Sequence, residues 1–247
     1  VRMAGAVGSD AFATDALALM KQAGTDLSAV NVVDEATGTA HILVGGDGEN
    51  VIIVVAGANG AVTEKDGVAA VEAMDRGDTL VLQLEIPAAS IEAALSAAKK
   101  AGIRSLINIA PLTPDAARLG RMADIVIANE TEFELLAGKS GLRADERIAA
   151  MRRLHEETGQ TIIVTLGAEG VVALRENTIH TAKGLKIEPV DTVGAGDTFC
   201  GYLAASLDAG LDFEKALRRA AVAGSLACLK PGAQPAIPLA AEVEARL

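Results

Sequence analysis

The chain has 247 residues, half of them apolar and 22% charged, so it is globular rather than disordered and long enough for a sizeable core. A formal net charge of -11 disfavours nucleic acid and anionic membranes as partners. Aromatic residues make up only 2%, too few for the stacking platforms of a single-stranded nucleic-acid binder.

Strands and helices are predicted to alternate along most of the chain. This pattern is typical of an α/β protein with a mostly parallel sheet covered by helices, in which ligands bind at the carboxyl ends of the strands. In chain order we expect a strand running up to Gly8, a helix over 11–23, strands over 28–34, 40–44, 50–56 and 79–83, a helix over 90–101, a strand over 105–108, a helix near 114–121, a strand over 125–128, helices over 130–137 and 144–158, strands over 161–165, 171–174 and 186–190, and helices near 198–208 and 213–228.

The region 28–56 departs from this pattern. The Gly/Asp-rich turn 45–49 joins two strands and predicts an antiparallel hairpin, which suits a lid or an interface element.

The chain starts at Val1, already in a strand, so we expect an N-terminal piece to be absent. Cys200 and Cys228 lack metal-ligand spacing and are expected to be small buried side chains. Without a secretory signal or a long apolar run, a cytoplasmic location is expected.

The stretch 191–201, Asp-Thr-Val-Gly-Ala-Gly-Asp-Thr-Phe-Cys-Gly, carries the most chemical information. The N–H groups of Gly194, Ala195 and Gly196, with the positive end of the following helix, can form an anion hole. Asp197 comes next, and a carboxylate there would repel the anion. Its presence makes sense if Asp197 takes a proton from a hydroxyl that attacks a bound phosphoryl group. This chemistry is that of a small-molecule kinase.

A second motif, Asn129-Glu-Thr-Glu132, lies where a strand ends and a helix begins. Asn129 is a good N-cap, and acidic residues in the first turn favour the helix dipole, which accounts for much of the motif. The alternative is that Asn129 and Glu132 hold a hydrated Mg²⁺ near phosphates.

Three shorter motifs each allow a structural and a functional interpretation. Segment 165–170 is either an ordinary glycine turn or a platform along a nucleotide. Glu85, at a strand end, is either solvated or bound to sugar hydroxyls. Lys230 is either a solvated charge after a helix or part of a loop whose carbonyls point inward. The sequence contains no Walker A loop and no protein-kinase catalytic loop.

The stretch 191–199 closely resembles the second signature of the ribokinase-like (PfkB) carbohydrate kinases, and 129–132 resembles their N-x-x-E motif. The similarity extends over essentially the whole chain. It implies a single kinase domain over 1–247, with a three-layer α/β/α fold and a small antiparallel β lid within 28–56 that forms a homodimer. Further motifs resemble the members that phosphorylate D-ribose, at 48–51, 56–59, 83–85, 165–167 and 232–235.

The resemblance implies ATP-dependent phosphorylation of D-ribose at its 5-hydroxyl, with Asp197 as the general base. The N–H groups of Gly194, Ala195 and Gly196 would stabilise the γ-phosphoryl group, and Glu85 would bind a sugar hydroxyl. Mg²⁺ would lie near Asn129 and Glu132, mostly through water. ATP would be bound by Asn129, Thr165, Leu166, Gly167, Ala168, Glu169, Gly170 and Gly196.

Members of the family also use a monovalent cation, usually K⁺. Its ligands, mostly backbone carbonyls, would by position be Asp191, Val193, Ala227, Lys230, Gly232 and Ala236. Ala236 stands where the family often has Ser, so one hydroxyl ligand would be lost.

The sequence differs most from the family in its N-terminal part. An early Asn/Asp sugar-binding residue and a G-G-K-G-x-N motif are both absent from it. We therefore expect an incomplete sequence rather than a fragment with impaired activity. The alternatives are a sibling kinase for fructose, deoxyribose, an adenosine- or pseudouridine-like nucleoside or another sugar, and a truncated, non-catalytic sugar- or nucleotide-binding module.

Overall fold

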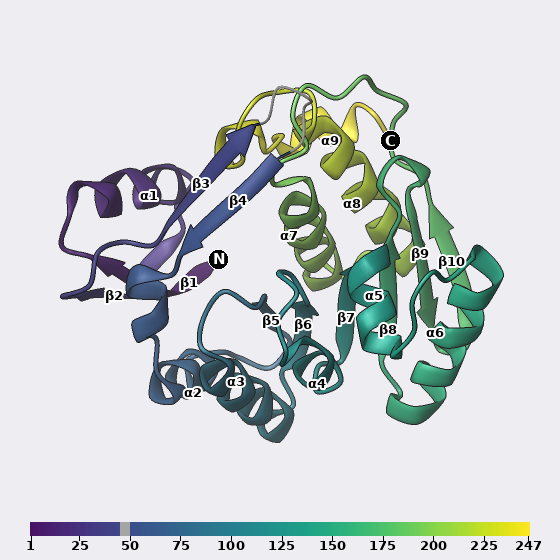
Figure 1. Cartoon of the computed structure of the whole chain (residues 1–247), viewed down its shortest axis with the longest axis horizontal. Helices are drawn as coiled ribbons and strands as arrows, with labels where there is room; N and C mark the ends of the chain where they lie inside the picture. Colours follow the sequence, from purple (N-terminus) through teal and green to yellow (C-terminus); the bar gives the residue numbers. More distant parts are fainter. Residues whose placement is uncertain (45–49) are drawn as a thin grey trace. The chain divides into compact units, whose positions relative to one another are not determined.

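The computed structural model describes residues 1–44 and 50–247. The chain divides into two compact units (Figure 1). The first contains Val1–Met74 and Leu84–Ala97, and the second contains Asp75–Gln83 and Ala98–Leu247. A single kinase domain over 1–247 stays a prediction. In the described part of the chain, no helix is both long and apolar enough to cross a bilayer.

The first unit is built on β1 (Arg2–Gly8) and β2 (Asp26–Val33), which pair in parallel and are connected by α1 (Ala11–Gln22). Asp10 caps α1 by accepting the N–H of Ala13. These elements confirm the predicted strand–helix–strand order, with β2 starting two residues before the predicted position 28.

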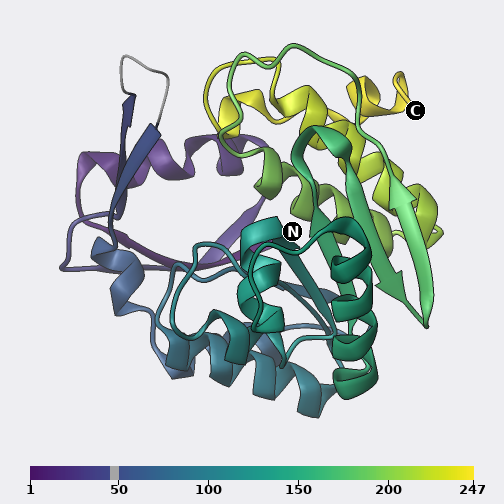
Figure 2. The ribbon, with the colours of Figure 1, turned by 45° about the vertical axis from the view of Figure 1, so that its right-hand side comes forward.

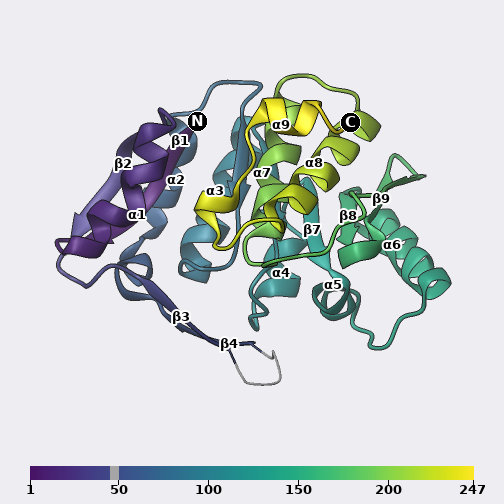
Figure 3. The same cartoon turned by 90° about the horizontal axis from the view of Figure 1, so that it is seen from above.

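The predicted hairpin is confirmed, because β3 (Thr39–Val44) and β4 (Asn50–Val55) form an antiparallel ribbon (Figure 3). The predicted turn 45–49 and part of the motif 48–51 lie outside the described residues. A short 3₁₀ helix, η1 (Gly57–Ala61), follows.

Helix α2 (Glu64–Glu72) was not predicted. It begins with a capping box between Thr63 and Asp66, but Gly67 lies inside it and lowers its helix propensity. A Cβ on Gly67 would lie 2.6 Å from the carbonyl oxygen of Ser90, in α3 (Ala88–Ala101). The lack of a side chain at Gly67 therefore allows α2 and α3 to pack closely. The pattern of apolar residues in the sequence does not indicate this contact.

The second unit contains a six-stranded sheet in the order β10-β9-β8-β7-β6-β5. Strands β5 to β8 run parallel, while β9 and β10 are added antiparallel at one edge. The mostly parallel sheet is thus confirmed. The strands are β5 (Thr79–Leu82), β6 (Arg104–Asn108), β7 (Ile125–Asn129), β8 (Thr161–Thr165), β9 (Val171–Arg175) and β10 (Thr178–Ala182).

Helices cover both faces of this sheet, which gives the three-layer arrangement (Figures 1 and 2). Helices α7 (Ala195–Asp208) and α8 (Phe213–Ala227) share a hydrophobic cluster with Ile125 and Ile127 of β7. Side chains alternate along a strand, so Val126 and Ala128 are buried on the opposite face. That face is covered by α4 (Ala116–Gly120), α5 (Glu130–Ala137) and α6 (Ala144–Thr158).

The predicted strand over 186–190 is wrong, and β10 was missed. Pro189 lacks an N–H for a sheet, and the N–H of Val190 donates instead to the carbonyl of Cys228 at 2.8 Å. The edge position is taken by β10, which follows β9 through a two-residue turn at Glu176 and Asn177. That turn contains no glycine, so the sequence shows no obvious hairpin signal there.

Candidate active site

A cavity of about 180 Å³ lies in the second unit, where the parallel strands end. Asn108 ends β6, Asn129 ends β7 and Thr165 ends β8, and Asn129 and Thr165 are paired in register. Strand ends and the first turn of α7 therefore contribute polar groups to one place, as predicted for this class of fold. The residues lining the cavity are Asn108, Ala110, Ile127, Asn129, Glu132, Thr165, Gly196, Asp197 and Cys200.

The first turn of α7 supplies Gly196 and Asp197. Gly194 is the N-cap with φ 74°, and a Cβ there would lie 3.2 Å from Ala233. The helix begins three residues before the predicted position 198, so Ala195 and Gly196 are helical rather than a separate turn. The N–H of Ala195 donates to the carbonyl of Thr192 at 3.3 Å. The N–H groups of Gly196 and Asp197 have no partner within the helix and are available to an anion.

Asn129 and Glu132 form a reciprocal capping box at the start of α5. The Oδ1 of Asn129 accepts the N–H of Glu132, and a Glu132 carboxylate oxygen accepts the N–H of Asn129, both at 2.8 Å. The N-cap interpretation is therefore confirmed. Burial raises the pKa of Glu132, although the Asn129 N–H opposes the shift.

The same two side chains also suit a hydrated Mg²⁺. Both line the cavity, and amide and carboxylate oxygens are the ligands that Mg²⁺ prefers. Glu132 is only 6% exposed, and a divalent cation would offset the cost of its buried negative charge. Each oxygen used in the capping box retains a second lone pair.

Asp191 connects the segment before α7 to the loop after α8. Its two oxygens accept the N–H groups of Val193 at 3.0 Å and Gly232 at 2.9 Å, and these bonds hold the pKa of the carboxyl below its usual value. Among the described residues, no hydrogen bond engages the carbonyls of Val193, Lys230 or Gly232. Carbonyl oxygens beside a carboxylate suit a monovalent cation. The structure thus joins Asp191 to two other predicted K⁺ ligands, Val193 and Gly232, and their binding of K⁺ stays a prediction.

The other predicted K⁺ ligands lie nearby in the chain. Ala227 ends α8, and Ala236 is buried in the 3₁₀ helix η3 (Gln234–Ala236). The Nζ of Lys230 is 3.4 Å from Glu242 in α9 (Ala240–Glu244), so its side chain is engaged at the surface while its carbonyl remains available.

The other residues predicted to bind the nucleotide or the sugar mostly lie outside the cavity lining. Segment 166–170 is the turn between β8 and β9 and includes the 3₁₀ helix η2 (Gly167–Glu169), but only Thr165 of the motif lines the cavity. The hydroxyl of Thr165 is 3.4 Å from the carbonyl of Ala128. Glu85 is exposed in the first unit, and its role as a sugar ligand stays a prediction.

Sequence reasoning missed four lining residues: Asn108, Ala110, Ile127 and Cys200. Asn108 could have been predicted from the sequence, because it is a polar residue at the end of a strand next to the strand of Asn129. Cys200 is buried as expected, and burial, together with the charges of Asp197 and Glu132, strongly raises the pKa of its thiol.

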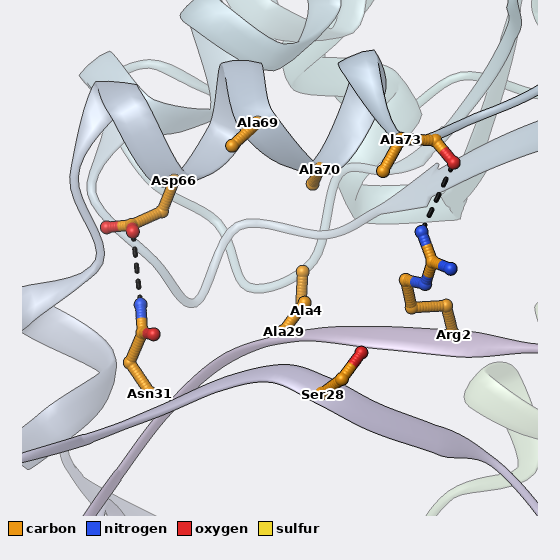
Figure 4. A pocket seen from close by; sticks show the side chains of 9 residues that line it. All are labelled: Arg2, Ala4, Ser28, Ala29, Asn31, Asp66, Ala69, Ala70 and Ala73. Carbon is orange, nitrogen blue, oxygen red and sulfur yellow. Dashed lines mark hydrogen bonds between the residues drawn. The ribbon is translucent and has the colours of Figure 1, made fainter.

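A larger cavity, of about 320 Å³, lies in the first unit between the β1–β2 sheet and α2 (Figure 4). Its polar groups already have partners: Asn31 donates to Asp66 at 3.0 Å, and Arg2 donates to the carbonyl of Ala73 at 3.2 Å. Most of the remaining lining is alanine. The smaller cavity therefore has the chemistry of an active site despite its size.

Comparison with known proteins shows which family the chain belongs to. The family model described as pfkB family carbohydrate kinase matches residues 1–240. The chain belongs to this family of carbohydrate kinases. The ribokinase of Haemophilus influenzae is 33% identical over 233 residues, which covers 94% of this chain and 76% of that protein.

Two further similar proteins are a deoxyribokinase and a ribokinase of known structure. The deoxyribokinase of Salmonella typhi is 31% identical over 235 residues, covering 94% of this chain and 76% of that protein. The structure of Arabidopsis thaliana ribokinase, complexed with ribose and ATP, has a TM-score of 0.89 and 31% identity, covering 99% of this chain and 80% of that one.

Proposed function

We propose that this kinase transfers the γ-phosphoryl group of ATP to the 5-hydroxyl of D-ribose, giving D-ribose 5-phosphate and ADP. The observation that carries the proposal is Asp197, which shares a cavity with Asn129 and Glu132 at the N-terminal turn of α7. Asp197 accepts the hydroxyl proton, the sugar oxygen bonds to the γ-phosphorus, and the bond to the ADP oxygen breaks.

The chain supports this step mainly by position and charge. The N–H of Gly196 and the helix dipole stabilise the negative charge of the transferring group. Asn129 and Glu132 hold Mg²⁺, which when bound offsets phosphate charge. The loops joined by Asp191 hold K⁺, and Thr165 to Gly170 line the nucleotide. Glu85 binds a sugar hydroxyl.

A related substrate is the second candidate. The similarity to a deoxyribokinase, at 31% identity, supports 2-deoxy-D-ribose as an alternative acceptor. We also propose a homodimer through the β3–β4 ribbon, because Ile53, Val54 and Val55 are each about half exposed there. The cytoplasmic location stays a prediction.

The test is ADP release from MgATP in the presence of D-ribose, 2-deoxy-D-ribose, fructose and adenosine, with K⁺ or Na⁺ as the only monovalent cation. We expect release with D-ribose that is faster in K⁺. Release with another acceptor alone would replace the proposed substrate. If no acceptor promotes release while MgADP still binds, the chain is a binding module and the kinase proposal is wrong.

A further inference from the structure

Helix α6 presents a buried cation to the start of α5. The side chain of Arg147 is 11% exposed, and its Nη2 donates to Oε1 of Glu130. Glu130 is the first residue of α5 and follows Asn129 directly. A desolvated guanidinium is costly unless paired, so this contact strongly restrains both side chains.

The first turn of α5 holds two carboxylates with different surroundings. Glu132 lines the cavity and closes the capping box with Asn129. Glu130 is not among the residues that line the cavity in the described part of the chain, and Arg147 binds it instead. Of the two carboxylates in this turn, Glu132 is therefore the one that lines the cavity.

Further contacts anchor α5 along its length. Glu134 accepts the N–H of Leu142 at 2.7 Å, which fixes the loop between α5 and α6. The Nη2 of Arg153 donates to the carbonyl of Ala137 at 3.0 Å, at the opposite end of α5 from Glu130. Arg147 and Arg153 therefore tie the same helix pair together, but only Arg147 does so beside the candidate site.

We infer that Arg147 is a positioning residue for the metal–nucleotide site: by holding Glu130 it fixes the first turn of α5 and, through that turn, the oxygens of Asn129 and Glu132. This inference rests on the proposed function, because it assumes that those oxygens receive a hydrated divalent cation. Groups that orient metal ligands from outside the coordination sphere commonly change metal affinity by about 10–100-fold.

The experiment measures ADP binding by calorimetry, with and without Mg²⁺, for the unaltered chain, Arg147→Met, Glu130→Ala and the double variant. We expect each single variant to weaken Mg²⁺-dependent ADP binding by about tenfold and to leave metal-free binding unchanged. The double variant should be no weaker than either single one, because both remove the same contact. Arg147→Lys should recover part of the loss.

Arg153→Met is the matched control, since it loosens α5 against α6 away from the site. Equal losses in Arg153→Met and Arg147→Met would overturn the inference in favour of general loosening. Unchanged binding in Glu130→Ala would also overturn it, and this half-exposed position is the safer one for folding. If the unaltered chain binds ADP without any Mg²⁺ dependence, the inference fails. If MgADP binds normally but ribose gives no turnover, only the proposed substrate fails.

Discussion

Asp197 occupies an exposed position in the first turn of α7, while the next three residues, Thr198, Phe199 and Cys200, are buried. The buried side chains fix the helix against the sheet, and the carboxylate stays accessible beside the free N–H groups of the turn. An acid at this place also interacts favourably with the helix dipole.

Replacing Asp197 with Asn is expected to keep the fold and MgADP binding but to lower kcat by about 10²–10⁴-fold, because the amide cannot accept the hydroxyl proton. Steady-state kinetics with D-ribose, alongside MgADP calorimetry, would measure the two effects separately. Turnover close to that of the unaltered enzyme would show that Asp197 is not the base.

Asp10 serves a structural purpose in the first unit. It accepts hydrogen bonds from the N–H of Ala13 at 3.1 Å and from the N–H and hydroxyl of Thr37 at 2.8 and 2.7 Å. The Thr37 bonds are the main reason that its pKa lies below the ordinary value of 3.8. The charged form is therefore the one that the fold prefers.

Asp10→Asn is expected to lower the free energy of unfolding at neutral pH. A depressed pKa contributes stability above the unfolded-state value of 3.8 and loses it as the pH falls through the folded-state value. The difference between the two proteins should therefore shrink on acidification. Urea unfolding of both at pH 7 and at acid pH would check this, and a difference that grows on acidification would contradict it.

At the scale of elements, the hairpin between β9 and β10 contains the only non-glycine residues with positive φ in the described part of the chain. Glu176 has φ 49° and Asn177 has φ 64°. Two successive positive φ angles are typical of a type I′ turn, for which Asn is favoured and Glu is not. The pair of Glu176 with Arg175 is exposed and contributes little.

We expect Glu176→Asn to raise the free energy of unfolding by about 0.5–1 kcal/mol, because Asn tolerates the left-handed region better. Asn177→Ala should be destabilising, because Ala tolerates this region less well and because the bond from Arg152 to Oδ1 of Asn177 at 3.0 Å is lost. Both shifts can be read from urea midpoints at constant m-value. A lower midpoint for Glu176→Asn would mean that the turn needs the Glu176 side chain.

Elements were predictable where local chemistry marks both ends. Helices α5 and α6 and strand β8 have the predicted bounds, and Gly138 and Gly159 end the two helices in the left-handed region. Helix α2 was not predictable because Gly67 serves a contact with α3, and β10 was not because its turn lacks glycine.

For the candidate site too, the sequence predicts residues whose position follows from a local pattern and misses contacts between distant segments. Residues at strand ends, such as Asn129 and Thr165, follow from the geometry of a parallel sheet, and Asn108 would have followed from the same rule. The Arg147–Glu130 pair joins two helices across 17 positions of the chain, and nothing in the local pattern around either residue indicates it.

At the scale of the whole molecule, the residues predicted to bind the nucleotide and its metal all belong to the second unit, whereas Glu85 belongs to the first. A ligand protects most strongly the segments whose opening disrupts its binding site. The nucleotide should therefore affect the two units unequally.

Saturating MgADP is expected to slow amide exchange in 125–132 and 191–198 and to leave β1 and β2 of the first unit nearly unchanged. At about 100 times the dissociation constant, binding adds roughly 2.7 kcal/mol to the opening free energy of the segments that must open to release it. Hydrogen exchange followed by mass spectrometry would measure this. Equal slowing in β1 and β2 would contradict the assignment of the nucleotide to the second unit.

The hydrogen bond between Asp191 and Gly232 joins the two ends of the α7–α8 helix pair, since Asp191 precedes α7 and Gly232 follows α8. This bond lies at the end of the pair that faces the candidate site, and the exposed turn at Gly210 lies at the opposite end. We therefore expect an insertion at that exposed turn to leave the spacing between Asp191 and Gly232 unchanged. The turn at Gly210 is therefore the position in this helix pair where a reporter peptide could be inserted without moving Asp197.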